Sequence, residues 1–312
     1  MSSLPAGVAI AVLGGDDREV VLVTELVRMG ANVRVAGISK LAENSAVQCF
    51  YRIEDAVRNT GFIILPMPGT DEKGTVRAKY GIQPLVLTPD SLLPVRDGGV
   101  VIVGVARPTL REMVAQRGLK LVEIAEMDEV AILNSVPSAE GAIQMAMEAT
   151  DITIHGSSTL VLGFGRCGVT LARMLAGLGA KTSVTARQPS DLARIREMGL
   201  QPLTYLELPE CIGEFDIIFN TVPTLVLDKS LLEKVNPVVY ICDIATAPGG
   251  IDYTAAEQLG LNAVLAPGLP GKAAPRTAGL ILASIIPQII INELNTSSSV
   301  SGRTSGNSGV FA

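Results

Sequence analysis

Short apolar runs alternate with helix-spaced segments along most of this 312-residue chain, and this alternation constrains the fold more than any other feature. Apolar runs of this length, bounded by glycine or proline, are typical of buried strands. They form two series, at residues 8–13, 32–37, 62–65 and 100–103, and at residues 159–162, 181–185, 216–220, 238–242 and 263–265. Because helical stretches separate the strands, the sequence predicts an α/β protein with two doubly wound parallel sheets.

The two series divide the chain into two Rossmann-like domains. The expected ranges are 1–137 for a substrate domain, 138–150 for a connecting helix, 151–275 for a second domain, 276–295 for a closing helix and 296–312 for a tail. Ser138 is the expected N-cap of the connecting helix, and Pro287 is expected to bend the closing helix. The tail is rich in Ser, Gly and Asn, so we expect it to be disordered.

Composition excludes several classes of function. The 25 Lys and Arg residues are outnumbered by 31 Asp and Glu, and a net charge of −6 argues against nucleic-acid or polybasic membrane binding. One histidine, and four cysteines without CxxC spacing, argue against a zinc site, so no metal is expected. The apolar stretch 279–291 contains Pro287 and is too short to cross a bilayer, and residues 1–7 show no signal peptide. We therefore expect a cytoplasmic protein.

The sharpest motif is a glycine-rich turn with GxGxxG spacing, formed by Gly163, Phe164, Gly165, Arg166, Cys167 and Gly168. The spacing alone is weakly specific, but here a predicted strand enters the turn and a predicted helix leaves it. The first glycine permits a tight turn, the second lets a pyrophosphate approach the backbone, and the third allows close helix–strand packing. The helix N-terminus offers N–H groups to the phosphates. The sequence predicts a dinucleotide-binding turn, with a purely structural turn as the alternative.

The end of the next strand distinguishes NADP from NAD. NAD sites usually place Asp or Glu there, to accept hydrogen bonds from the ribose 2′-hydroxyl. This chain has Arg187 instead, and no carboxylate before Asp191. A guanidinium group would pair with a 2′-phosphate, so NADP is the expected cofactor, with NAD as a possibility. The alternative is an exposed arginine that stacks on adenine without selecting either cofactor.

Two further turns follow strands of the second domain. One contains Asn220, Thr221, Val222 and Pro223, and turns of this composition can run past the nicotinamide ribose. The other, residues 267–271, contains Gly268 and would line the same cleft as a rigid turn. A purely structural role explains either turn nearly as well.

Several segments together resemble the family of dipicolinate synthase A-subunits. They are VAIAVLGGDDR at 8–18, NSVPSAEG at 134–141, TIHG at 153–156, the glycine-rich turn at 163–168, DIATAPGG at 243–250 and APGLPGKAAPRTAG at 266–279. Their order and spacing agree with the family from about Gly7 to Leu294, which leaves out only the tail. The glycine-rich turn alone would fit many families, whereas the set is specific.

This resemblance implies an architecture like that of the formate and glycerate dehydrogenases, and a role in sporulating bacteria on the lysine branch pathway. It implies an NADP-type cofactor and a flavoprotein-like partner, the dipicolinate synthase B-subunit. Together the two subunits would oxidise dihydrodipicolinate, or its hydrated precursor, to dipicolinate. Such a substrate becomes aromatic on losing a hydride, so orientation and neutralisation of its carboxylates matter more than a strong base. A homo-oligomer is also expected.

Few side chains could catalyse this reaction or bind its substrate. His155 is the lone histidine, but it precedes the strand that leads into the glycine-rich turn, whereas ligands prefer the carboxyl ends of strands, so a structural role is favoured over catalysis. Arg18 and Arg276 are the preferred partners of the substrate carboxylates, with ordinary surface ion pairs as the alternative. Ser135, Ser138 and Glu140 are further substrate candidates at the start of the connecting helix.

Two other functions remain open on the sequence. A subunit that binds a dinucleotide but performs no chemistry would equally explain the scarcity of acid–base side chains. A 2-hydroxy-acid dehydrogenase would share the architecture, but it needs a histidine–carboxylate pair at the carbonyl, and His155 is poorly placed for that role.

Overall fold

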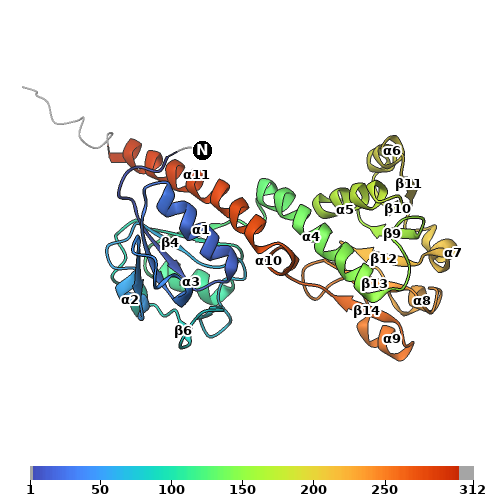
Figure 1. Ribbon diagram of the computed structural model, residues 1–312, viewed down its shortest axis with the longest axis horizontal. Coiled ribbons are helices and arrows are strands. Elements are labelled where there is room, and N and C mark those ends of the chain that lie inside the picture. Colours follow the sequence, from blue (N-terminus) through green and yellow to red (C-terminus); the bar gives the residue numbers. More distant parts are fainter. Residues whose placement is uncertain (1–2, 302–312) are drawn as a thin grey trace, which may run out of the picture. The chain divides into compact units, whose positions relative to one another are not determined.

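The structure, a computed structural model, describes residues 3–301 and divides into two compact units. The N-terminal unit combines the residues up to Val130 with those from Pro275 onward, and the central unit comprises residues 131–274. Each unit contains one six-stranded sheet with helices on both faces (Figure 1). The predicted α/β class with two doubly wound parallel sheets is confirmed.

The sheet of the N-terminal unit has the strand order β3-β2-β1-β4-β7-β8, and all of its pairings are parallel. The strands are β1 (Ala9–Leu13), β2 (Asn32–Ala36), β3 (Val47–Phe50), β4 (Phe62–Ile64), β7 (Val100–Val103) and β8 (Lys120–Glu123). The strand order reverses between β1 and β4. In open α/β sheets, ligands bind at the carboxyl edge beside such a reversal.

Successive residues of β1 point to opposite faces of this sheet, and each face has its own helices. Ile10 and Val12 share a buried cluster with α1 (Asp17–Arg28) and α11 (Pro275–Ser301). On the other face, Ala11 and Leu13 share a cluster with α2 (Ile53–Ala56) and α3 (Pro108–Gln116). Both faces are buried, which explains why the strands read as continuous apolar runs.

Helix α11 joins the C-terminal segment to the N-terminal unit by packing along α1 (Figure 1). At the contact, a Cβ atom on Gly279 would lie 2.7 Å from the backbone oxygen of Arg18 and 2.7 Å from the Cβ of Val21. Real Cβ atoms do not approach backbone so closely, so only glycine allows this contact. The helix α11 is long and apolar enough to cross a membrane, but half of that stretch is buried, so it serves as a core helix of this unit.

A short hairpin covers part of the carboxyl edge of the N-terminal sheet. Its strands β5 (Thr75–Val76) and β6 (Leu85–Val86) pair antiparallel. Between them, the chain forms isolated bridges that join Ala78 to Gly15 and Tyr80 to Ile38. The covering segment therefore lies against the residues that follow β1 and β2.

The sheet of the central unit has the order β11-β10-β9-β12-β13-β14, again with every pairing parallel. Its strands are β9 (Ser158–Leu162), β10 (Lys181–Thr185), β11 (Gln201–Leu203), β12 (Ile217–Asn220), β13 (Tyr240–Asp243) and β14 (Asn262–Leu265). This is the strand order of dinucleotide-binding folds, with its reversal between β9 and β12. The glycine-rich turn follows β9, so it lies at that reversal.

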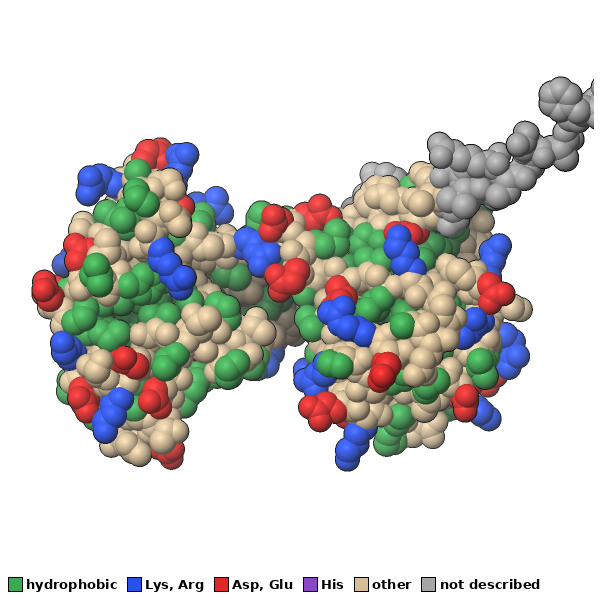
Figure 2. All heavy atoms as spheres, turned by 180° about the vertical axis from the view of Figure 1, so that it is seen from behind, with side chains coloured by type: hydrophobic (Ala, Val, Ile, Leu, Met, Phe, Trp, Pro, Cys, Tyr) green, Lys and Arg blue, Asp and Glu red, His purple; other side chains and the backbone are tan. Residues whose placement is uncertain are grey.

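Helices also cover both faces of the central sheet. One buried cluster contains residues of α4 (Asp128–Ala149), α5 (Arg166–Gly177), α6 (Pro189–Glu197) and α10 (Leu269–Ala273). The other contains residues of α7 (Leu208–Cys211), α8 (Lys229–Leu232) and α9 (Tyr253–Gln258). On the face of each unit shown in Figure 2, acidic and basic side chains are interspersed.

The connecting helix begins earlier than expected. Helix α4 starts at Asp128, not at Ser138, and the acidic side chains of Asp128 and Glu129 in its first turn favour a helix start there. Ser138 therefore lies inside the helix and is not its N-cap, and its hydroxyl donates to the carbonyl oxygen of Asn134 at 2.8 Å. The two units divide at residues 130 and 131, where we expected a boundary after residue 137.

The closing helix is longer than expected. We placed its end at residue 295, whereas α11 continues to Ser301, so residues 296–301 are helical and do not belong to a disordered tail. Pro287 lies inside this helix. The rest of the predicted tail, residues 302–312, lies outside the described residues.

Candidate functional site

The glycine-rich turn lies at the carboxyl end of β9 and holds its three glycines for different reasons. Gly163 has a φ of +95°, and a Cβ there would lie 2.7 Å from Oγ1 of Thr221. A Cβ on Gly168 would collide with the carbonyl oxygen of Gly163. The backbone N–H of Gly163 donates to Oγ1 of Thr185 at 3.0 Å, which ties the turn to the end of β10. Close contacts with other protein atoms therefore require glycine at the first and third positions.

Gly165 differs, because a Cβ there would meet no protein atom within 4 Å. It is the N-cap of α5, its backbone is extended, and no side-chain cap bond is made there. The N-cap residue thus brings neither a carboxylate nor a hydroxyl to this helix start, and the space above Gly165 is open. These are the features that a pyrophosphate needs at a helix N-terminus, so the turn fits a dinucleotide.

The remaining residues of the turn are placed around this helix start. Arg166 and Gly165 are exposed, whereas Phe164 and Cys167 are half-buried. Burial raises the pKa of the Cys167 thiol and outweighs the opposing charge of Arg166. The thiol is therefore protonated at neutral pH, which argues against its use as a nucleophile.

A buried carboxylate organises the neighbouring strand ends. Asp243, at the end of β13, is fully buried. Its Oδ1 accepts from the amide of Asn220 and the N–H of Ala245, each at 2.9 Å, and its Oδ2 accepts from the N–H of Gly250 at 2.7 Å and the hydroxyl of Tyr253 at 2.9 Å. Four donors on one buried carboxylate fix the loop 244–250 against the end of β12.

Asn220 also holds the turn formed by residues 220–223, which the sequence predicts to lie near the dinucleotide. Its amide nitrogen donates to the carbonyl oxygen of Val222 at 2.9 Å, and its Oδ1 accepts from the N–H of Val222 at 3.1 Å. Thr221 donates from its hydroxyl to the carbonyl oxygen of Leu162 at 2.8 Å, which places the turn directly beside Gly163. Residues 220–223 and the glycine-rich turn therefore lie on one edge of the central sheet, the edge at which we expected a dinucleotide.

Arg187 lies two residues beyond β10, on the same edge, and is exposed. Its guanidinium carbon is 5.8 Å from the ring centroid of Tyr205, which follows β11. Ala186, between the strand and Arg187, is buried and offers no carboxylate. The position that would hold Asp or Glu in an NAD site thus carries an apolar residue followed by a cation.

His155 lies at the opposite edge of this sheet. It precedes β9, and its ring packs so closely against Gly179, after α5, that a Cβ on that glycine would overlap the imidazole. The N–H of Gly156 donates to the carbonyl oxygen of Gly179 at 2.9 Å. Five strand residues separate this histidine from the glycine-rich turn. Within the central unit, the structure therefore does not bring His155 to the dinucleotide edge.

The substrate candidates of the central unit fall into two groups. Ser135 is fully buried, and its hydroxyl lies 2.6 Å from Oγ1 of Thr170 on α5, so it joins two helices. Ser138 bonds within its own helix, as described above. Glu140 and Gly268 are exposed, and Gly268 has a φ of +70° at the start of α10. A Cβ on Gly141, the residue after Glu140, would lie 3.3 Å from the Cβ of Leu269, the residue after Gly268, so α4 packs against α10 beside these two candidates.

Arg18 in the N-terminal unit is nearly buried and held by Asp16. Its Nε and Nη2 atoms donate to the two carboxylate oxygens of Asp16 at 2.9 and 2.8 Å. Burial opposes ionisation of Asp16, but the hydrogen bonds from Arg18 outweigh it and lower the pKa of that carboxyl. These bonds use two of the five N–H donors of the guanidinium group. Arg276 is exposed at the start of α11, one helical turn before the contact of Gly279 with Arg18.

Glu19 completes this cluster and was not predicted from the sequence. It is fully buried, and its Oε2 accepts from the N–H of Asp16 at 2.7 Å, so the two residues form a capping box at the start of α1. Gly15 donates its N–H to the carbonyl oxygen of Arg77 at 2.6 Å. The start of α1 is thus capped by the side chains of Asp16 and Glu19 and covered by the hairpin, so it cannot accept a pyrophosphate, although both units share one strand order.

Two family models match the chain. Residues 9–125 match the N-terminal domain of the dipicolinate synthase A-subunit, and residues 134–250 match the NAD binding domain of D-isomer specific 2-hydroxyacid dehydrogenases. The dipicolinate synthase A-subunit of Bacillus subtilis strain 168 is 40% identical over 286 residues, which cover 91% of this chain and 96% of the relative. The chain belongs to the dipicolinate synthase A-subunit family.

Comparison with solved structures gives the same family. The dipicolinate synthase A-subunit from Bacillus halodurans has a TM-score of 0.89 at 36% identity, over 92% of this chain and 99% of that one. Its counterpart from Bacillus subtilis has a TM-score of 0.87 at 38% identity, over 94% and 99%. D-Lactate dehydrogenase from Escherichia coli, at a TM-score of 0.60 and 14% identity, covers 92% of this chain and 97% of that one and shares the fold alone. The predicted family is confirmed, and the central unit is a dehydrogenase-type domain for a nicotinamide dinucleotide.

Burial of Glu19 predicts a pH-dependent stability for this member of the dipicolinate synthase A-subunit family. Burial raises the pKa of Glu19 to about 7, although Arg18 opposes the shift. The folded protein therefore holds a proton that the unfolded chain loses near pH 4.5, and stability decreases as pH rises from about 4.5 to 7. Glu19→Gln should remove this decrease, which is on the order of 3 kcal/mol. Urea unfolding at pH 5 and pH 8 measures it, and equal pH dependence of both proteins would contradict the assignment.

Proposed function

We propose that this chain is the NADP-dependent oxidoreductase subunit of a dipicolinate synthase. With a flavoprotein-like second subunit, it would convert dihydrodipicolinate, or its hydrated precursor, to dipicolinate in the cytoplasm of a sporulating bacterium. The observation that carries the proposal is the open, uncapped start of α5 at the same sheet edge as Arg187, in a chain of the dipicolinate synthase A-subunit family. Membership of the family supports the substrate class, and the geometry of the glycine-rich turn supports the cofactor site.

The proposed reaction requires little acid–base chemistry from the protein. The dihydropyridine ring loses a hydride and a proton, two electrons leave with the hydride, and the ring becomes aromatic. Bound NADP⁺ supplies the hydride acceptor. The first turn of α5 would hold its pyrophosphate, Arg187 its 2′-phosphate, and residues 220–223 the nicotinamide ribose. Arg18 and Arg276 are the proposed partners of the substrate carboxylates.

The proposed selectivity for NADP depends on Arg187. Arg187→Ala should weaken NADP binding by about 10- to 100-fold and change NAD binding much less, because each charge-assisted hydrogen bond to the 2′-phosphate contributes about 1.5–3 kcal/mol. Isothermal titration calorimetry with both cofactors measures the ratio. Arg194→Ala is the matched control, since Arg194 is also an exposed arginine of the same unit, in the last turn of α6, and it pairs with Glu197 at 2.8 Å. An unchanged ratio in Arg187→Ala would contradict the role.

His155 should be dispensable for turnover. Because it lies at the amino edge of the central sheet, His155→Asn is expected to keep turnover within about twofold of wild type, apart from any loss of stability through its packing on Gly179. Steady-state rates at saturating cofactor test this, with the melting temperature as the control. A loss of 100-fold or more in a stably folded variant would instead support a dehydrogenase mechanism based on histidine.

The decisive test of the function uses freshly generated dihydrodipicolinate. The chain is assayed alone and with its second subunit, and the ultraviolet absorbance of the aromatic product is followed with NADP⁺ or NAD⁺. Product that requires NADP⁺ and both chains is expected. Absence of product despite NADP binding would favour a subunit that binds the dinucleotide without performing chemistry.

A further inference from the structure

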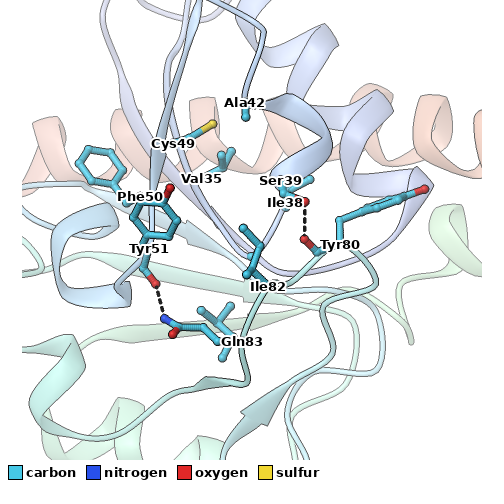
Figure 3. Close-up of a pocket in the computed structure, with 12 residues that line it drawn as sticks. Val35, Ile38, Ser39, Ala42, Cys49, Phe50, Tyr51, Tyr80, Ile82 and Gln83 are labelled. Carbon is cyan, nitrogen blue, oxygen red and sulfur yellow. Dashed lines mark hydrogen bonds between the residues drawn. The ribbon is translucent and has the colours of Figure 1, made fainter.

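A small cavity opens at the carboxyl edge of the N-terminal sheet, and all of its lining residues belong to the N-terminal unit (Figure 3). The end of β2, the edge strand β3 and the segment 80–85 of the covering hairpin surround it. The cavity measures about 130 Å³, and no Asp, Glu, Lys or Arg lines it. Its lining includes Val35, Ile38, Cys49, Tyr51, Ile82 and Gln83.

Two side-chain hydrogen bonds join the segments that form this wall. Ser39 donates from Oγ to the carbonyl oxygen of Tyr80 at 2.7 Å, and the amide of Gln83 donates to the carbonyl oxygen of Tyr51 at 3.2 Å (Figure 3). These bonds connect the hairpin segment to residues that follow β2 and β3. The interior of the cavity is apolar, and these hydrogen bonds hold the backbone around it in place.

The size of the cavity limits its occupant. Cofactor and drug-sized ligands occupy pockets of roughly 300–1,000 Å³, whereas an apolar cavity of about 150 Å³ accommodates one benzene ring. A cavity of about 130 Å³ therefore fits one ring-sized or branched apolar group. A dinucleotide or a flavin is too large for it.

Two exposed apolar side chains, Tyr51 and Ile82, form the rim of the cavity and indicate a protein partner. Tyr51 is 78% exposed and Ile82 is 77% exposed, and these are the two most exposed large apolar side chains in the part of the N-terminal unit that the structure describes. Both line the same cavity. A small ligand inside the cavity would leave this rim in water, whereas a protein surface with one inserted side chain would cover it. Such an anchor in a pocket, surrounded by further contacts, is the usual centre of a protein interface.

The charges beside the cavity indicate the character of that surface. Lys40 and Lys79 both donate to Asp17, at 2.7 and 2.6 Å, and their ammonium groups lie 5.0 and 5.4 Å from the ring centroid of Tyr80. Hydrogen bonds from Lys40, Lys79 and Tyr80 hold the pKa of Asp17 well below its usual range. Two cations therefore share one carboxylate, and this group keeps a net charge of +1 at neutral pH. A partner surface with carboxylates would complement it.

We propose that this cavity is the docking site for the second subunit of the synthase, which inserts one aromatic or leucine side chain flanked by acidic residues. The inference rests on the two-subunit function proposed above. It assigns the contact to β2, β3 and the hairpin of the N-terminal unit. The dinucleotide edge of the central unit is not part of it.

Single glutamates at the rim test the proposal. Ile82→Glu and Tyr51→Glu should each weaken binding of the purified second subunit by roughly tenfold or more, because they place a negative charge at the anchor and repel its acidic flanks. Leu93→Glu is the matched control, since Leu93 is 62% exposed in the same unit but does not line the cavity. Calorimetric titration measures the affinity, and NADP titration of each variant shows that the cofactor site is unchanged. Wild-type affinity in both rim variants would overturn the proposal.

Cys49 gives a second readout, because its thiol faces the cavity (Figure 3). Bound second subunit should slow alkylation of Cys49 by N-ethylmaleimide at least fivefold, measured by peptide mass spectrometry with Cys211 as the reference thiol. If free dipicolinate alone protects Cys49 and displaces the second subunit, the cavity is a small-molecule site and the proposal is wrong. Failure of wild-type subunits to associate would also overturn it, while NADP binding by the chain would still support the proposed cofactor function.

Discussion

Gly165→Val should weaken NADP binding by about 100-fold or more, while its cost in stability at this N-cap position should be only about 1 kcal/mol. The substitution is informative because a Cβ at Gly165 meets no protein atom within 4 Å, and its φ of −83° suits any residue. The added side chain would occupy only the space proposed for the pyrophosphate. Two lost charge-assisted hydrogen bonds from backbone N–H groups, each about 1.5–3 kcal/mol, account for the expected change. Calorimetric titration with NADP measures the affinity.

The control for Gly165→Val is Gly177→Val, at the other end of α5. A Cβ on Gly177 also meets no protein atom within 4 Å, so both variants add the same side chain to open space on one helix. Urea unfolding of both variants in the absence of cofactor checks that the fold is intact. Wild-type NADP affinity in a folded Gly165→Val protein would exclude the start of α5 as the phosphate site. That result would support a purely structural role for the glycine-rich turn.

The glycine-rich turn could be predicted because its environment is local. A buried strand of consecutive apolar residues, the three glycines and a helix of 12 residues all lie within 20 residues. The same holds for most central strands, since burial on both faces makes them continuous apolar runs. The edge strands β3, β8 and β11 were missed because they are short and partly polar, as in Lys120–Glu123. Their pairing depends on the neighbouring strand and leaves little mark on their own sequence.

The N-terminal candidate site could be predicted only in part. Arg18 was identified from its place after β1, but its bidentate pairing with Asp16 depends on side-chain geometry at the helix start. The capping-box spacing of Asp16 and Glu19 was readable as a helix signal, yet the burial of Glu19 comes from the hairpin that folds over this edge. That hairpin lies about 60 residues further along the chain. Contacts of this separation leave no periodic signal, so the cluster needed the structure.

The role of Asp243 also depends on contacts that the sequence does not reveal. Its substitution is expected to have the largest effect on stability. Asp243→Ala should lower the free energy of unfolding of the central unit by about 3–5 kcal/mol, because it leaves the donors of Asn220, Ala245, Gly250 and Tyr253 without their acceptor in a fully buried place. Asp228→Ala is the matched control, since Asp228 caps α8 in the same unit from an exposed position and should lose only about 1 kcal/mol. Urea unfolding compares the two.

A milder variant keeps this prediction testable if Asp243→Ala does not fold. Tyr253→Phe removes one of the four donors and should cost about 1 kcal/mol. Because the cluster also fixes Asn220 and thereby residues 221–223 beside Gly163, Tyr253→Phe should in addition weaken NADP binding by a few-fold, whereas Asp228→Ala should not. Equal stability losses for Asp243→Ala and Asp228→Ala would show that the buried carboxylate does not organise this edge. Because the cluster links β12 and β13 through a single side chain, stability and cofactor affinity should decrease together in its variants.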